Sequence, residues 1–201
     1  GGLQAGCVHK RACAGFEYFP EEGAEEVSFK AAIEALGGAK YAGSVLSAAA
    51  KFGIDTPLRQ AHWLAQIAHE SGRFRYVREI WGPTPAQQRY EPPSSLAAKL
   101  GNTEAGDGHK FMGRGFIQVT GRANYREASR DLFGNETLLA KPELLERDPA
   151  LSAGWYWKKR GINKHADRDD LIAVTKAING GTNGLDDRAA CLKIAKRSMG
   201  L

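Results

Sequence analysis

The clearest hydrophobic pattern in the chain is a helical one that follows Thr56 and Pro57. Threonine before proline is a typical helix start, because the hydroxyl can cap the first turn and proline is tolerated at the first helical position. The apolar residues that follow lie on one helical stripe: Leu58, Ala61, Leu64, Ala65 and Ala68. The pattern predicts a helix that runs to about Ser71-Gly72.

Further helices are predicted on both sides of this one. Ser28 is placed to cap a helix that stops at Gly37-Gly38, and a second helix covers about residues 42–51. The segment from 81 to 102 contains four prolines and is predicted to be a loop with at most one helical turn. The later predicted helices cover about residues 125–132, 149–160, 170–178 and 184–199. These patterns indicate a mainly α protein.

Residues 116–120, which lie between glycines, are the best candidate for a β-strand. A period of two would place Phe116, Gln118 and Thr120 on one face, and would turn the other two side chains into the core. The Gln118 amide and the Thr120 hydroxyl would then lie about 7 Å apart, suited to holding a water molecule or the acetamido group of a sugar. An ordinary edge strand with a polar outer face is the alternative interpretation.

Length and composition fit one folded domain of ordinary size, or one domain with a short extension. The chain has 201 residues, of which 42% are hydrophobic and 25% charged. No segment approaches the roughly 20 apolar residues of a membrane helix, so stable membrane insertion is not expected. The net charge of +5 is spread along the chain. It can favour anionic polymers, but no nucleic-acid-binding motif accompanies it.

Cysteine and histidine usage argues against a disulfide framework or a metal site. Cys7, Cys13 and Cys191 are too few for a disulfide-stapled domain, and spacing does not decide whether Cys7 and Cys13 pair. The five histidines show no ligand spacing with cysteine or a further carboxylate, so no metal is expected. No signal peptide is visible at the N-terminus.

Two glutamates are candidate catalytic residues. Hydrolysis of a glycosidic bond usually requires two carboxyl groups, and Glu70 and Glu79 are nine residues apart. On one continuous helix they would differ by about 900° of rotation and about 13.5 Å of rise, and would point to opposite sides. A break at Ser71-Gly72 would let Glu79 return across a cleft. A separation of about 6.5–9.5 Å would indicate inversion, and about 5–5.5 Å retention. Glutamates at this spacing also occur by chance.

Several short motifs follow one another along residues 55–195: 65–72 (AQIAHESG), Glu79, 101–102 (GN), 106–108 (GDG), 113–125 (GRGFIQVTGRANY) and 178–181 (INGG). Taken together, these segments resemble glycoside hydrolase family 19, the chitinase-like family, and most closely its bacterial and phage endolysin branch.

The resemblance implies a mainly α, lysozyme-like fold of two lobes with a very small β element and an active-site cleft between the lobes. Residues 28–201 would form the catalytic domain, and residues 1–27 an N-terminal extension or lead-in. The mechanism would be inverting and cofactor-free, with Glu70 as general acid, Glu79 as general base and Thr120 helping to hold the attacking water. The implied substrate-binding or supporting residues are Gln118, Asn124, Asn179 and Arg188, with His69, Tyr90 and Lys164 carried over across loops of different length.

Departures from the family pattern favour peptidoglycan over chitin as the substrate. The segment between Glu79 and Gly101 is short, and neither a cysteine-rich chitin-binding module nor the disulfides of plant chitinases are present. Residues 109–112 replace an aromatic-rich stretch of phage members, which weakens the case for sugar stacking there. We expect a monomeric, bacteriolytic and antimicrobial endolysin or lysozyme (muramidase) type enzyme. It would be made in the bacterial cytoplasm and act in the periplasm or on the cell wall. The alternatives are a chitinase and a non-catalytic wall-binding module.

Overall fold

The computed structural model describes residues 27–201, and the structure of this part is mainly α-helical. Cys7, Cys13 and almost all of the predicted lead-in lie outside the described residues. The elements, in chain order, are α1 (Phe29–Ala35), the 3-10 turn η1 (Ala39–Tyr41), α2 (Ala42–Phe52), α3 (Pro57–Glu70), α4 (Pro85–Gln88), α5 (Ser95–Leu100), α6 (Asp107–Lys110), α7 (Arg122–Phe133), α8 (Thr137–Ala140), α9 (Leu144–Arg147), α10 (Pro149–Lys159), α11 (Asn163–Ala166), α12 (Leu171–Asn179) and α13 (Leu185–Ser198).

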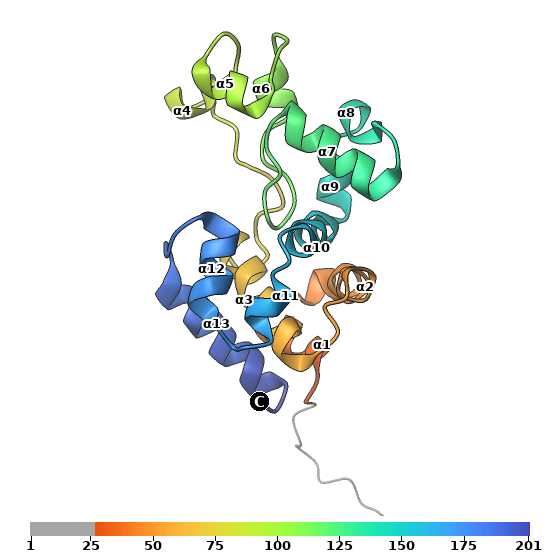
Figure 1. Cartoon of the computed structure of the whole chain (residues 1–201), viewed down its shortest axis with the longest axis vertical. Coiled ribbons are helices and arrows are strands. Elements are labelled where there is room, and N and C mark those ends of the chain that lie inside the picture. Colours follow the sequence, from red (N-terminus) through yellow and green to blue (C-terminus); the bar gives the residue numbers. More distant parts are fainter. Residues whose placement is uncertain (1–26) are drawn as a thin grey trace, which may run out of the picture.

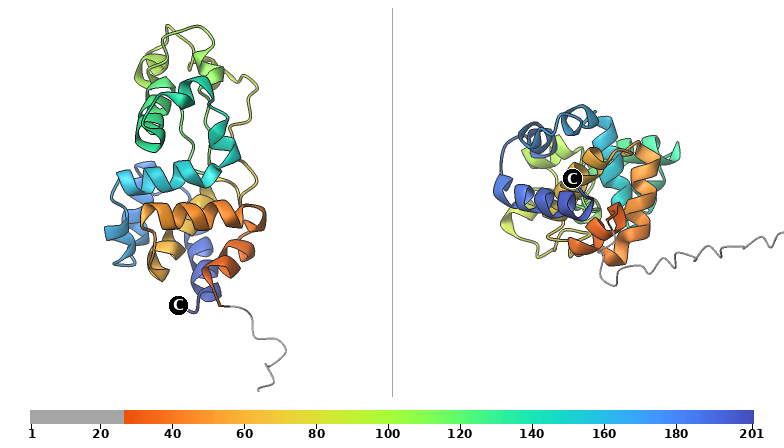
Figure 2. Two further views of the ribbon diagram at one scale, coloured as in Figure 1. Left: turned by 90° about the vertical axis from the view of Figure 1, so that its right-hand side faces the viewer. Right: turned by 90° about the horizontal axis from the view of Figure 1, so that it is seen from below.

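The helices divide into two lobes, as the family resemblance implied. Figure 1 shows α1–α3 and α11–α13 in the lower lobe and α4–α9 in the upper one, with α10 lying between them. The segments before α4 and between α6 and α7 run along the junction of the lobes. The same division is visible after a quarter turn about the vertical axis in Figure 2. No helix within residues 27–201 is long and apolar enough to cross a membrane.

Helix α3 forms the centre of the lower lobe. It starts as predicted, with the Thr56 hydroxyl accepting a hydrogen bond from the Arg59 N–H at 3.3 Å and proline at its first position. Its residues 61–68 are all buried, and its most extensive helix contact is with α13. Complete burial of a side chain such as Leu64 contributes about 2 kcal/mol, and hydrogen bonds from Arg188 of α13 to Gln66 and Glu70 hold the end of α3.

The predicted helix break after Glu70 is confirmed, and its cause is local. The Ser71 hydroxyl donates to the Ile67 carbonyl at 2.6 Å and accepts from the Phe74 N–H at 2.9 Å. Gly72, Arg73 and Phe74 follow with positive φ angles of 58°, 60° and 63°. Three consecutive left-handed residues cannot continue an α-helix, so the chain reverses here and proceeds toward Glu79.

The predicted strand at residues 116–120 is wrong. Arg114 and Val119 form a bridge, with their backbone N–H···O distances at 3.2 and 2.9 Å, and residues 115–118 form the turn between them. The expected alternation of faces is absent from this turn, because Phe116, Ile117 and Val119 are all buried.

Residues 115–118 form a turn and not a strand because of Gly115 and the large aromatic residue that follows it, Phe116. Gly115 adopts φ +87°, which allows the chain to turn immediately. Phe116 then packs edge-on against Phe74 and Tyr41, with ring centroids 5.1 and 5.2 Å apart. The side chain that was expected on a polar face therefore anchors the turn in the core.

The expectation of at most one helical turn between residues 81 and 102 is also wrong. Two short helices, α4 and α5, form there, and the hydroxyls of Thr84 and Ser94 cap them. Pro85 occupies the first turn of α4, where proline is compatible with a helix. Helix α7 begins three residues earlier than expected, at Arg122. The four-residue helices α6, α8, α9 and α11 were not predicted, since one turn shows no periodicity.

Candidate active site

Glu70 is the last residue of α3, and Arg188 of α13 binds its carboxylate from the protein interior. Arg188 Nη2 donates to Glu70 Oε1, while Nη1 donates to Gln66 Oε1 one turn earlier on α3. The Arg188 side chain is 2% exposed and that of Glu70 is 28% exposed. Among residues 27–201, none donates a hydrogen bond to Glu70 Oε2. One carboxylate oxygen is therefore fixed, and the other remains available to a ligand.

The loop between α12 and α13 completes the support of Arg188. The Asn183 carbonyl accepts from Arg188 Nε at 3.2 Å and from Asn179 Nδ2 at 3.0 Å. Asn179 Oδ1 in turn accepts from the Gly181 N–H at 2.8 Å. Asn179, which was predicted to line or support the cleft, is thus seen to shape the loop that holds Arg188 against Glu70.

His69 is held beside this cluster by Asp187. His69 Nδ1 lies 2.7 Å from Asp187 Oδ2, and Arg73 Nη2 donates to Asp187 Oδ1 at 3.1 Å. The hydrogen bonds from His69 and Arg73 hold the pKa of Asp187 below its usual value. A Cβ at Gly184 would lie 2.3 Å from His69 Cε1, so glycine is required for the imidazole to pack there.

Glu79 lies on the segment that connects the lobes, and both of its oxygens are bound. Oε1 accepts from Gln87 Nε2 at 2.9 Å and from the Tyr90 hydroxyl at 3.4 Å. Oε2 accepts from the Gly113 N–H at 3.2 Å, and the Glu79 N–H donates to the Gly113 carbonyl at 2.8 Å. Burial and the charge of Glu79 raise the pKa of Tyr90 above its usual value, so its phenol stays protonated as a donor.

Gln87 was not predicted as a site residue, although it makes the shortest hydrogen bond to the Glu79 carboxylate. Its side chain also donates to the Ile80 carbonyl at 2.8 Å and accepts from the Thr84 N–H at 2.8 Å, and the residue is 5% exposed. Thr84 and Gln87 form a capping box, a pattern of threonine and glutamine three residues apart that is readable from sequence. This capping pattern lies within residues 81–102, which the prolines led us to predict as a loop.

A cavity of about 550 Å³, here called the Glu79 cavity, opens beside the second glutamate. Trp81 and His109 form part of its wall, with their ring centroids 5.2 Å apart. Trp81 also lies 6.1 Å from Tyr90, ring centroid to centroid. Aromatic rings of this kind are suited to stacking on the apolar face of a sugar. Residues 109–112 were not expected to contribute to stacking, and the structure shows that His109 of this segment contacts Trp81.

A second cavity of about 490 Å³, the Thr120 cavity, brings together three of the predicted site residues. Gln118, Thr120 and Asn124 line it, and Asn124 Nδ2 donates to the Thr120 carbonyl at 2.7 Å. Their grouping arises from the turn and the start of α7, and does not require the predicted strand. Residues 118–120 line the Thr120 cavity, and Gly113, a few residues earlier in the same segment, donates its N–H to Glu79.

Lys164, the remaining predicted substrate-binding residue, is not brought to this region. It is exposed on α11, and its side chain makes no hydrogen bond or ion pair with the part of the chain that the structure describes. It lines neither the Glu79 cavity nor the Thr120 cavity.

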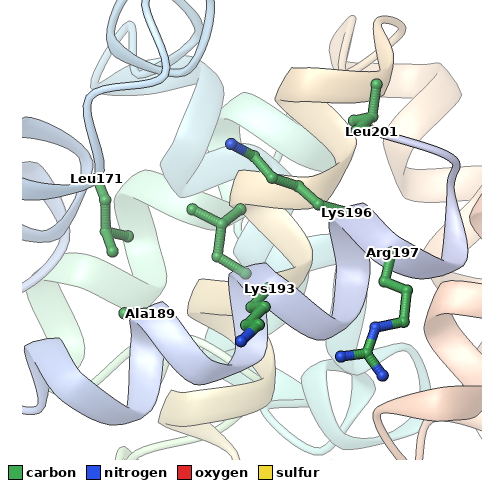
Figure 3. A pocket seen from close by; sticks show the side chains of 7 residues that line it. Leu171, Ala189, Lys193, Lys196, Arg197 and Leu201 are labelled. Carbon is green, nitrogen blue, oxygen red and sulfur yellow. The ribbon is translucent and has the colours of Figure 1, made fainter.

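A third cavity lies on the outer side of α13. It has a volume of about 550 Å³ and is lined by apolar residues such as Leu171 and Leu192, with Lys193 and Arg197 at its rim (Figure 3). None of the predicted site residues lines it, so it is not part of the candidate active site. Cys191 is buried on the same helix, and burial raises the pKa of its thiol to about 11, which makes it unreactive at neutral pH.

Comparison with known proteins gives a family match and several relatives. The model of the glycosyl hydrolase 19 family, described as chitinase class I, matches residues 39–188. A glycosyl hydrolase family 19 domain-containing protein of Haemophilus influenzae is 34% identical over 164 residues, which cover 69% of this chain and 78% of that protein. An endochitinase of Arabidopsis thaliana is 35% identical over 124 residues, which cover 60% of this chain and only 39% of the plant protein.

Solved structures give the fold independently. Chitinase C of Streptomyces griseus superposes with a TM-score of 0.62 at 24% identity, covering 95% of this chain and 79% of that one. A class IV chitinase of Zea mays superposes with a TM-score of 0.60 at 22% identity, covering 88% and 92% of the two chains. At these identities the likeness establishes the mainly α, lysozyme-like fold.

Proposed function

Because the chain belongs to glycoside hydrolase family 19, we propose that it is an endolysin-type enzyme that hydrolyses the β-1,4 bonds of peptidoglycan with inversion. That it is a chitinase-like glycoside hydrolase follows from the family. This removes the non-catalytic wall-binding alternative. The substrate and the roles of individual residues are the proposed part.

The proposed mechanism uses one glutamate to release the leaving group and the other to activate water. Glu70 gives its proton to the glycosidic oxygen as the bond from that oxygen to the anomeric carbon breaks. Water attacks the anomeric carbon from the opposite face, and Glu79 accepts the proton that the water loses. Thr120 would hold this water by its hydroxyl. The two carboxyl groups then regain their starting states by exchanging a proton through solvent.

The observation that carries this proposal is that the two carboxylates, one at the end of α3 and one on the segment between α3 and α4, are anchored separately. Glu70 has one oxygen fixed by Arg188, and Glu79 has both oxygens fixed by Gln87, Tyr90 and Gly113. The reversal at residues 71–74 turns Glu79 away from the line of α3. Fixed geometry at both groups is what acid–base catalysis on a bound sugar requires.

Charge supports peptidoglycan as the substrate. Peptidoglycan carries carboxylates on its peptide stems, whereas chitin is neutral. Residues 1–27 contain two basic and five acidic residues, so residues 28–201 have eight more positive than negative charges. A positive catalytic domain gains attraction for an anionic polymer and none for a neutral one. Chitin is the second candidate, because the Arabidopsis relative is named an endochitinase.

Digestion of purified Gram-negative peptidoglycan by the wild type and by Glu70→Gln tests the proposal. We expect the wild type alone to release fragments ending in reducing N-acetylmuramic acid, identified by mass spectrometry. Release of reducing ends from N-acetylglucosamine oligomers, with none from peptidoglycan, would make the enzyme a chitinase. Equal release of fragments by the wild type and by Glu70→Gln would show that Glu70 is not required for hydrolysis.

We also propose that the enzyme acts as a monomer on the cell wall or in the periplasm. Both carboxylates and both cavities of the candidate site are built from one chain. Light scattering on the purified protein, at the concentration of the activity assay, should give the mass of one chain of 21.8 kDa. A dimer mass would contradict this part of the proposal.

A further inference from the structure

We infer that Arg160 forms a carboxylate-binding subsite that recognises the peptide stem of peptidoglycan, an inference that rests on the proposed function. Arg160 caps the C-terminal end of α10 and lines the Thr120 cavity. It faces the cavity that also contains Gln118, Thr120 and Asn124. A substrate group bound by these three residues would therefore be near a guanidinium.

The charges around the Thr120 cavity leave Arg160 without a carboxylate partner. Glu127 is the acidic residue of the lining, and it binds Lys159 Nζ at 2.7 Å. Lys159 also binds Asp131 at 2.9 Å, so its charge is fully engaged. Arg160 makes no ion pair with any residue between 27 and 201, and it is exposed. Its positive charge is therefore available to a ligand.

Arg160 is nevertheless held in place, and Tyr156 provides the support. The guanidinium carbon lies 5.0 Å from the centroid of the Tyr156 ring, one turn earlier on α10. The Tyr156 hydroxyl donates to the Ile178 carbonyl at 3.1 Å, which fixes the ring. A guanidinium that is positioned over an aromatic ring keeps its N–H edges free, and these edges match the two oxygens of a carboxylate.

The same support connects Arg160 to the first glutamate. Ile178 is followed directly by Asn179, which shapes the loop that holds Arg188 against Glu70. The subsite is therefore built on the structure that positions the proposed acid.

Chitin and peptidoglycan would present different chemical groups to Arg160. Chitin offers hydroxyl and acetamido groups, for which Gln118 and Asn124 are sufficient partners. A peptide stem adds carboxylates, for which an unpaired guanidinium is the natural partner. Arg160 would thus contribute specificity for peptidoglycan and leave the bond-breaking step unaltered.

The test compares two glycans: peptidoglycan strands with their peptides, and the same strands after an amidase has removed the peptides and the lactyl carboxylates that this hydrolysis frees have been converted to amides. Arg160→Gln should raise the KM for peptide-bearing strands by about tenfold, with kcat within about twofold, since one charge-assisted pair is lost. The rise on stripped strands should be at least fivefold smaller. Arg160→Lys should recover part of the loss.

Lys158→Gln is the matched control, because it removes the same charge from an exposed residue that lines a different cavity. It should leave both values of KM unchanged. An equal rise in KM on both glycans for Arg160→Gln would overturn the inference, as would no rise on either. An equal effect of Lys158→Gln would show that only overall charge matters.

A binding measurement distinguishes failure of this inference from failure of the proposed function. If the wild type cleaves only chitin, the proposed function is wrong. The subsite can then be examined by titrating a soluble disaccharide-tetrapeptide into Glu70→Gln with and without Arg160→Gln. Weaker binding in the double variant supports the subsite, and identical binding overturns it.

Discussion

At the scale of single residues, the two glutamates differ in how they are held. Glu70 is bound through one oxygen by a buried guanidinium, and Glu79 is bound through both oxygens by an amide, a phenol and a backbone N–H. A group that must approach the glycosidic oxygen benefits from one free oxygen. A group that must keep a water molecule in line benefits from complete fixation. This difference underlies the roles proposed for them.

Replacing either glutamate by glutamine should lower kcat by about 10²–10⁴, because each contributes a proton transfer in the transition state. The roles can be separated kinetically. Glu70→Gln should recover activity on an aryl glycoside whose leaving group needs no proton, and Glu79→Ala should be rescued by azide. Circular dichroism and thermal unfolding should show that the folds are retained. If azide rescued the Glu70 variant and the aryl glycoside rescued the Glu79 variant, Glu79 would be the acid and Glu70 the base.

Thr120→Ala should cost less than either glutamate substitution, about tenfold in kcat, because a second water can replace one hydroxyl in part. Thr120→Ser is the control, since it keeps the hydroxyl in the Thr120 cavity and should retain most of the activity. A loss from Thr120→Ala larger than that from Glu70→Gln would contradict the role of water positioning.

Gln87 is a positioning residue, and its replacement should reveal how strictly Glu79 must be held. Gln87→Ala removes the 2.9 Å hydrogen bond to Glu79 and the capping contact to the Thr84 N–H. We expect kcat to fall by about tenfold or more with little change in KM, because the substrate does not contact this buried amide. Gln88→Ala, an exposed neighbour on α4, should leave both constants unchanged. A change in KM alone would mean that Gln87 acts on substrate binding.

At the scale of elements, the helices with an apolar stripe were predictable and the short segments were not. α1, α2, α3 and α10 begin and end close to the expected positions, because their caps, glycines and prolines are local signals. The sequence pattern predicts a strand at residues 116–120 where the structure has a turn at 115–118, because alternation of polar and apolar residues does not show that Phe116 packs against Phe74 and Tyr41 in the core. That contact is tertiary, and a single sequence does not contain it.

The candidate site shows the same division. Glu70 and Glu79 stood out through the chemistry of glycoside hydrolysis and the predicted break, Thr120 stood out through the polar face of the predicted strand, and Arg188 was added by the family resemblance. Gln66 and Asp187, which hold Arg188 and His69, were not predicted. Each joins segments more than 100 residues apart in the chain. Hydrogen bonds between residues so far apart in the chain can be identified only once the packing of α3 against α13 is known.

The segment between α5 and α7 has its own electrostatic anchor, which predicts a response to acid. Asp107 accepts from Arg122 Nε and Nη2 at 2.7 and 2.6 Å, and from the backbone N–H groups of Thr103 and Glu104. Burial alone would raise the pKa of Asp107, but these hydrogen bonds outweigh it and hold the pKa below its usual value. The folded state therefore favours the carboxylate, and stability gained above the ordinary Asp pKa is lost as the pH falls through the folded-state value.

Asp107→Asn should lower the free energy of unfolding at pH 7 by about 2–3 kcal/mol, since it leaves a largely buried guanidinium without its main partner. Below about pH 4, the stability of the variant should also fall less steeply than that of the wild type, because the variant has no Asp107 carboxylate to protonate. Urea unfolding at pH 7 and at pH 3 measures both effects. Asp186→Asn, an exposed acid in the first turn of α13, is the control. A difference between wild type and Asp107→Asn that does not depend on pH would contradict the linkage.

At the scale of the whole molecule, charge is distributed unevenly along the chain. Residues 28–201 carry eight net positive charges and residues 1–27 carry three net negative ones. On an anionic wall polymer, the positive part provides long-range attraction and the negative part opposes it. The attraction between exposed charges is screened over about 10 Å at 0.1 M salt and about 3 Å at 1 M. Wall binding should therefore depend on salt, and binding to neutral chitin should not.

This charge distribution predicts that the acidic residues 1–27 weaken binding to the anionic cell wall. Removing residues 1–27 should strengthen binding to purified sacculi several-fold at 0.1 M salt, and the difference should vanish near 1 M. The first helix retains its Ser28 cap in the shortened chain, and thermal unfolding should confirm that it folds. A full-length variant with Glu21, Glu22, Glu25 and Glu26 all changed to Gln separates charge from chain length, and it should bind as tightly as the shortened chain. If only the shortened chain binds more tightly, residues 1–27 act by occupying space and not by their charge, and net charge would no longer support peptidoglycan over chitin.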